Sequence, residues 1–238
     1  MPKGRLEAFS DGVIAIIITI MVLELKLPHG HDLAALLEVS PHFCAYVMSF
    51  VYIGIYWNNH HHLLHLCTRV SGGILWANLH LLFWLSLVPF ASEWLGETHS
   101  APLPTALYGV LLLMAAISYT LLQTVIIRRH GDESRLKAAV GRDLKGKISM
   151  VLYAIALPLA FHVPLASDAL YAVVAAIWLV HLPNGFFLPG GYEFNLTLIG
   201  ALVCLMLTGA GALSVDGRRA SHAAAARAGR ARIRAGNV

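Results

Sequence analysis

The feature that most constrains this chain is an apolar segment near its N-terminus, from Arg5 to Pro28. No charged residue occurs between Gly12 and Leu23. A helix over residues 6–27 would be roughly 33 Å long, because each helical residue adds about 1.5 Å. That length is enough to cross a hydrocarbon core of about 30 Å. The segment therefore predicts a membrane-spanning helix.

The composition extends this prediction to the whole chain. Hydrophobic residues make up 58% of it and charged residues only 13%, whereas soluble domains usually contain about 25% charged residues. We therefore expect an all-α, polytopic helical membrane protein, with Pro89 kinking the third span and a short interfacial helix over 33–39. The six apolar segments that predict spans cover residues 6–27, 42–66, 74–95, 105–127, 148–163 and 167–182.

Three domains follow from this pattern. Residues 1–183 are expected to form a six-span unit, residues 184–216 a linker with an extra hydrophobic segment, and residues 217–238 a basic tail that we expect to be disordered. The run 194–213 is long enough to be a seventh span, although a re-entrant or interfacial position would keep the basic tail on the inner side. Residues 190–216 weakly resemble the C-terminal span of the DoxX membrane family.

Basic residues set the expected orientation. Lys3 and Arg5 precede the first span, and residues 128–147 contain most of the other loop cations. Because loops rich in Lys and Arg stay inside, we expect a cytoplasmic N-terminus in the cell inner membrane. The net charge of +4 is concentrated in such juxtamembrane segments and in the tail, which argues against nucleic-acid binding.

The first span carries one apolar stripe, with Thr19 one helical step away from it. Residues that recur at steps of three and four lie on one helix face. From the pattern alone, this face could contact lipid, a protein core or a pore. The stripe consists of Phe9, Val13, Ile16, Ile20, Leu23 and Leu27.

The same span contains a specific motif. Arg5 is followed by Phe9-Ser10-Asp11, by an Ile-rich run with Thr19, and by the segment LELKLP at 23–28. Over residues 5–183 the chain resembles the transmembrane protein 175 family of potassium-permeable channels. The resemblance implies a homotetramer, as in bacterial members with one six-span unit. It also implies a pore lined by the first span, whose constriction would be formed by Ile16, Ile20 and Leu23.

Polar residues in the first span need partners, because an ionisable group that faces lipid is costly. Ser10 or Asp11 could instead cap a helix start, although the helix is expected to begin earlier. The resemblance implies a hydrogen-bonded network that keeps the pore helices in register, with partners in the second and third spans. The expected members are Arg5, Phe9, Ser10, Asp11, His60, His61 and Asn78.

The second span ends in a histidine cluster. His61 and His65 are one helical turn apart and could share a metal, but a closed site needs four ligands and no carboxylate or cysteine lies beside them. We therefore expect packing and hydrogen bonding rather than a metal site. A histidine here could also titrate near neutral pH.

Selectivity must arise without a carbonyl filter, because the chain has no Thr-Val-Gly-Tyr-Gly sequence. An isoleucine ring would exclude ions by dewetting. Thr19 and Glu24 would be the polar pore-lining residues, with Glu24 raising the local cation concentration.

The function predicted from the sequence is a leak-type potassium channel. The expected partners are potassium ions, the lipid bilayer and copies of the same chain, and no cofactor is expected. Because no nucleophile–base pair or nucleotide loop is evident, we do not expect an enzyme. The alternative is a proton-coupled secondary transporter that uses Asp11 and the span-two histidines, although such transporters usually contain inverted repeats, which we do not find. A non-transporting scaffold is a third possibility.

Overall fold

The structure is a computed structural model that describes residues 2–65, 67–130 and 143–179. Within these ranges every regular element is a helix, which confirms the all-α fold. The predicted seventh segment, the linker and the basic tail lie outside the described residues, as does most of the loop before residue 143. The helices are α1 Lys3–Leu23, α2 Leu33–Glu38, α3 Ser40–His65, α4 Gly72–Ser86, α5 Val88–Glu97, α6 Pro102–His130, α8 Leu144–Ala160 and α9 Pro164–Leu179.

Helix α1 is one uninterrupted span. It begins at Lys3, after Pro2 in an extended conformation, and its 21 residues correspond to about 31 Å of helix. Ser10 and Asp11 therefore lie two turns inside the helix, so the capping interpretation of these residues is wrong. The predicted interfacial helix is present as α2, where the Asp32 side chain accepts a hydrogen bond from the Ala35 N–H at 3.0 Å.

The third predicted span is divided into α4 and α5. Helix α4 ends at Ser86, and α5 begins at Val88 with Pro89 in its first turn. Proline has no N–H to continue the helical hydrogen bonds, and its ring clashes with the preceding turn. Residues 72–97 still form one stretch long and apolar enough to cross a membrane, as do α1 and residues 102–129 of α6.

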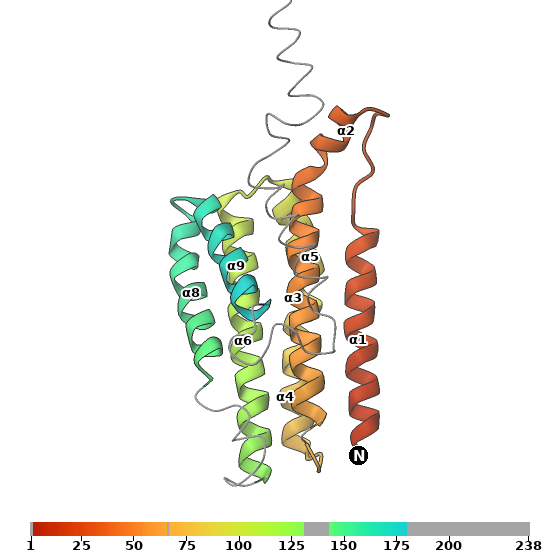
Figure 1. Cartoon of the computed structure of the whole chain (residues 1–238), viewed down its shortest axis with the longest axis vertical. Coiled ribbons are helices and arrows are strands. Elements are labelled where there is room, and N and C mark those ends of the chain that lie inside the picture. Colours follow the sequence, from red (N-terminus) through yellow and green to blue (C-terminus); the bar gives the residue numbers. More distant parts are fainter. Residues whose placement is uncertain (1, 66, 131–142, 180–238) are drawn as a thin grey trace, which may run out of the picture. The chain divides into compact units, whose positions relative to one another are not determined.

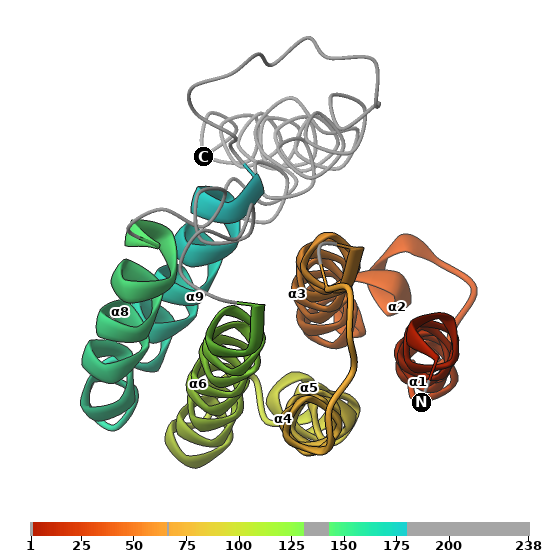
Figure 2. The same cartoon turned by 90° about the horizontal axis from the view of Figure 1, so that it is seen from below.

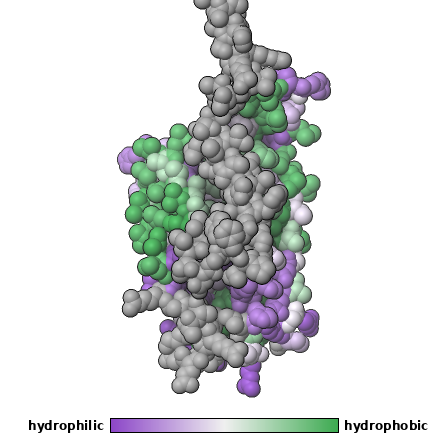
Figure 3. All heavy atoms as spheres, viewed as in Figure 1, coloured by the Kyte–Doolittle hydropathy of each residue, from purple (hydrophilic) through white to green (hydrophobic). Residues whose placement is uncertain are grey.

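Each described helix packs against several of the others. Helix α1 contacts α3, α4 and α5, while α6 contacts α4 on one side and α8 on the other. Figures 1 and 2 show α1 at one edge of this helical unit and the pair α8–α9 at the opposite edge. In Figure 3, apolar side chains gather on the left flank, where α8 lies, and polar ones gather toward the lower end. Such a surface is expected of a multi-pass membrane protein.

A cluster of buried tyrosines joins α3, α6, α8 and α9. The Tyr171 ring lies 5.8 Å from that of Tyr108 and 6.3 Å from that of Tyr153, between ring centroids. The Tyr52 hydroxyl donates to the Tyr171 carbonyl at 2.6 Å, and the Tyr171 hydroxyl donates to the Thr105 carbonyl at 3.1 Å. These hydroxyl groups therefore satisfy their hydrogen bonds inside the bundle. The sequence analysis did not identify this cluster.

Candidate ion-conduction site

Helix α1 has two faces with opposite environments. The face that packs against α3, α4 and α5 is buried and consists of Leu6, Ser10, Ile14, Ile17 and Met21. The opposite face is exposed although it is apolar: Ile16 is 59% and Leu23 83% accessible. The described helices therefore leave a continuous apolar face of α1 uncovered, and a face of this kind marks a surface that contacts lipid or further protein.

The residues predicted to form the constriction all lie on this uncovered face. Ile16 and Ile20 also border a groove whose other wall is formed by Ser86, Pro89 and Phe90 of α4 and α5. Leu23 is one turn beyond Ile20, at the last residue of α1. The three side chains are therefore stacked along the helix at intervals of about one turn, or 5 Å.

Two polar residues accompany this stripe. The Thr19 hydroxyl donates to the Ile16 carbonyl at 2.9 Å, so its proton is used within the helix and its lone pairs are left for other partners. Glu24 follows the last helical residue and borders the same groove. Burial raises the pKa of the Glu24 carboxyl, and the nearby Glu93 carboxylate raises it further.

A buried hydrogen-bonded chain fastens the other face of α1 to its neighbours. The Asn78 amide on α4 donates to the Ser10 hydroxyl at 3.0 Å, and its oxygen lies 2.6 Å from Nε2 of His60 on α3. The Ser10 hydroxyl in turn donates to the Leu6 carbonyl at 2.9 Å. Since Asn78 donates through its nitrogen, His60 Nε2 must carry the proton that the Asn78 oxygen accepts. The structure thus brings together three of the predicted network residues.

The other predicted network residues lie elsewhere. Asp11 is half-buried and accepts a hydrogen bond from the Trp57 indole at 3.0 Å, rather than from a histidine or asparagine. Arg5 and Phe9 are exposed. His61 is also exposed, and its ring lies 6.2 Å from that of Trp57 and 6.4 Å from that of His65, between centroids. Trp57 was the partner that the sequence analysis did not assign.

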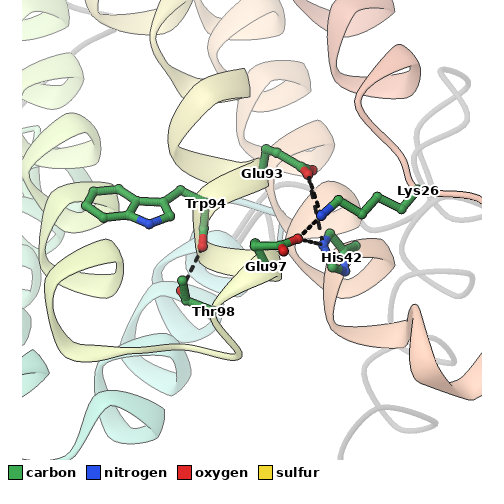
Figure 4. A network of polar contacts seen from close by, with 6 residues as sticks. All are labelled: Lys26, His42, Glu93, Trp94, Glu97 and Thr98. Carbon is green, nitrogen blue, oxygen red and sulfur yellow. Dashed lines mark hydrogen bonds and ion pairs between the residues drawn. The ribbon is translucent and has the colours of Figure 1, made fainter.

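A further polar cluster was not predicted. It lies at the opposite end of α1 from the N-terminus and joins the segment after α1 to α3 and α5 (Figure 4). The Lys26 ammonium pairs with the Glu97 carboxylate and lies 3.9 Å from that of Glu93, while His42 Nε2 lies 3.0 Å from Glu97. The four residues Lys26, His42, Glu93 and Glu97 are called the Lys26 cluster below. Glu93 and Glu97 are one turn apart on α5, but no sequence spacing connects them with His42.

Comparisons with known proteins place this architecture in a family. The family model described as "Endosomal/lysosomal potassium channel TMEM175" matches residues 5–89. A potassium channel of Chryseobacterium sp. (strain P1-3) is 56% identical over 180 residues, which are 76% of this chain and 94% of that protein. A potassium channel of Streptomyces collinus is 32% identical over 193 residues, which are 77% of this chain and 92% of that protein.

A solved structure agrees with these matches. It is the crystal structure of a lysosomal potassium-selective channel TMEM175 homolog from Chamaesiphon minutus, with a TM-score of 0.65 and 30% sequence identity. The match covers 74% of this chain and 95% of that chain. Sequence and fold lead to the same conclusion: the chain belongs to the TMEM175 family.

Proposed function

We propose that the chain is a potassium-permeable leak channel whose pore is lined by α1 from four copies. The observation that carries this proposal is the uncovered apolar face of α1, on which Ile16, Ile20 and Leu23 are exposed. One helix cannot enclose a pore, but cyclic symmetry can place four identical helices around an axis. The two bacterial relatives described above are named potassium channels, which supports potassium as the permeant ion.

The constriction would act through desolvation. Four isoleucine side chains at position 16 offer no oxygen atom, so an ion that passes them loses hydration water without replacement. Such a ring excludes ions when it is dry and conducts when it widens. Thr19, three residues along the same face, would provide hydroxyl lone pairs to a partly dehydrated cation. Glu24, near the end of the helix, would concentrate cations at the mouth.

The groove beside α1 supports assembly from several copies. It is bordered by Ile16 and Ile20 on one wall and by Phe90 on the other, and an adjacent subunit's α1 has the apolar side chains to fill it.

The basic segments near the N-terminus and after α6 favour a cytoplasmic N-terminus in the inner membrane. In this arrangement, residues 1–183 form the channel unit, and residues 184–216 and 217–238 are appended to it.

Single-channel recording in a planar bilayer tests the proposal. Purified full-length protein should produce discrete conductance steps that reverse near the potassium equilibrium potential. A slow, saturable flux without steps would favour the alternative, a proton-coupled carrier that uses Asp11 and the α3 histidines. Among the described residues, Asp11 accepts a hydrogen bond from Trp57 and His60 bonds to Asn78, so these bonds do not connect Asp11 with His60.

A matched pair of variants tests the position of the pore. Ile16→Asn adds amide oxygens to the proposed constriction, so it should increase cation flux and weaken discrimination between potassium and sodium. Ile155→Asn makes the same chemical change at an exposed position of α8. It should leave conductance and ion preference unchanged. If both variants behaved like the unmodified channel while staying tetrameric, position 16 would not be the constriction.

A further inference from the structure

The Lys26 cluster has the chemical composition of a cation site. One nitrogen of His42 and one oxygen from each of Glu93 and Glu97 all lie within 4.8 Å of one another. His42 comes from the first turns of α3, whereas both glutamates come from α5 (Figure 4). The His42 side chain is only 9% exposed, so its position is fixed by the surrounding helices rather than by solvent.

The packing of two helices brings the three ligand groups together. A side chain at Gly96 would place its Cβ 2.7 Å from the His42 Cα, so the absence of a side chain there allows α3 to approach α5 closely. Glu93 and Glu97 are one helical turn apart and flank Gly96 on the side that faces His42. The site is therefore built on rigid elements, which helps a metal site to hold its ligands.

The distances between the ligand atoms suit a small metal ion. Zinc binds imidazole nitrogen and carboxylate oxygen at about 2.0–2.2 Å, so neighbouring ligands of a tetrahedral site are about 3.4 Å apart. His42 Nε2 lies 3.0 Å from the Glu97 oxygen and 3.9 Å from that of Glu93. Small side-chain rotations would therefore fill three of the four ligand positions of a tetrahedral site and leave the fourth open to water.

Lys26 already places one positive charge between these carboxylates. Its ammonium is within ion-pair distance of both Glu93 and Glu97, so in this structure a cationic side chain of the same chain occupies the cluster. With a neutral His42, two carboxylates and one ammonium leave one negative charge uncompensated. A divalent ion would compensate both carboxylates. The Lys26 side chain is 46% exposed and can withdraw into water along its flexible stem.

We propose that His42, Glu93 and Glu97 form a reversible site for a divalent transition-metal cation, for which the Lys26 ammonium competes. The imidazole favours zinc-like ions over calcium and magnesium, which prefer a shell of oxygen ligands. The other His42 ring nitrogen, Nδ1, has no hydrogen-bond partner among the described residues. The site thus lacks the outer partner that raises metal affinity in many zinc centres, and this is why we assign exchangeable rather than permanent binding.

Calorimetric titration of the purified full-length protein with zinc chloride tests the proposal, with magnesium chloride as the comparison ion. We expect saturable binding of one zinc per chain and no comparable magnesium binding. His42→Ala and Glu97→Gln should each weaken zinc binding by more than about tenfold, because each removes a direct ligand. Lys26→Met should tighten it by about two- to fivefold, because an exposed ion pair contributes little and its removal frees the carboxylates.

The exposed histidines provide the control. His61 and His65 have stacked rings and lie on the same helix as His42, toward its other end. Replacing both with alanine should leave the zinc titration unchanged. Binding that survived His42→Ala but disappeared in the His61/His65 variant would overturn the proposal, as would an absence of zinc binding. The tighter binding expected of Lys26→Met cannot result from misfolding, and weaker binding in this variant would refute the competition.

Discussion

The substitution Asn78→Leu tests how α1 is held to the rest of the chain. Leucine has the same number of side-chain heavy atoms and the same branching but cannot form either hydrogen bond of the Asn78 amide. Asn78 bonds to Ser10 at 3.0 Å and to His60 at 2.6 Å, and all three residues are buried. The change therefore removes the polar connection between α1, α3 and α4 while it keeps the branched outline of the side chain.

The expected cost can be estimated bond by bond. His60 keeps its Nε2–H but loses the acceptor, and a buried donor without a partner costs about 1–3 kcal/mol. Ser10 loses one incoming bond, worth about 1 kcal/mol, but still donates to the Leu6 carbonyl. We therefore expect Asn78→Leu to lower the free energy of unfolding by about 2–4 kcal/mol.

Unfolding in mixed micelles of mild detergent and dodecyl sulfate, followed by tryptophan fluorescence, measures this change. Asn59→Leu is the matched control, because among the described residues the Asn59 amide bonds only to the Ile55 carbonyl one turn earlier in its own helix. It should cost less than about 1 kcal/mol. Equal destabilisation by the two substitutions would show that the chain of three buried residues contributes no special stability.

A double substitution makes the test stricter. When both partners of a buried hydrogen bond are replaced by apolar groups, no donor is left unsatisfied and the cost falls. The variant with both His60→Leu and Asn78→Leu should therefore be more stable than the sum of the two single effects predicts, by about 1 kcal/mol or more. Strict additivity would refute the assigned bond between these side chains.

Three further predictions concern other parts of the chain. Gly109→Ala should destabilise the protein by about 1–3 kcal/mol, because the new methyl group would overlap a buried tyrosine hydroxyl, whereas Gly54→Ala, with open space around it, should be neutral or slightly stabilising in a thermal melt. Glu24→Gln should raise the melting temperature near neutral pH. Burial raises the pKa of the Glu24 carboxyl, so the charged carboxylate lowers the stability of the folded state above that pKa. The gain in melting temperature should therefore shrink as the pH falls. A gain that does not depend on pH would contradict this cause. Asp11→Ala and Trp57→Phe should each cost about 1 kcal/mol, and the double variant little more, because both remove the same half-exposed bond. Chemical denaturation of the four proteins checks this additivity.

The long helices were predictable from the sequence because apolar length is directly visible in it, and three of the predicted spans coincide with stretches long and apolar enough to cross a membrane. The break between α4 and α5 also followed from Pro89, which cannot continue a helix. Helix ends were less accurate. The fifth span was predicted to start at Ile148, but α8 begins at Leu144, because the Asp143 carboxylate accepts a hydrogen bond from the Gly146 N–H. Hydropathy detects the membrane segment and not the cap that starts the helix.

Parts of the candidate site that lie within one helix were predictable from the sequence, whereas contacts between distant residues were harder to predict. The apolar stripe of α1 is a property of one helix, so its periodicity grouped residues that the structure leaves exposed, but the pattern alone did not show that this face would be uncovered. Asn78 was identified as a partner because a polar residue in a span must be satisfied, but its bond to Ser10 joins residues 68 positions apart. The Lys26 cluster joins three elements and has no spacing pattern, so only the tertiary structure reveals it.

The residues of α1 that bond to neighbouring helices lie on a different side of the helix from its exposed apolar face. Near the N-terminal end, Lys3 donates to the His65 carbonyl at 2.8 Å and Ser10 is bound by Asn78. Just beyond the other end, Lys26 binds the carboxylates of α5. All of these contacts go to α3, α4 or α5, and none uses the face of Ile16. Because the fastening groups and the uncovered stripe lie on opposite sides of one helix, substitutions in the stripe should alter ion passage while the fold is kept. Substitutions at Asn78 should instead alter the fold first and conduction as a consequence.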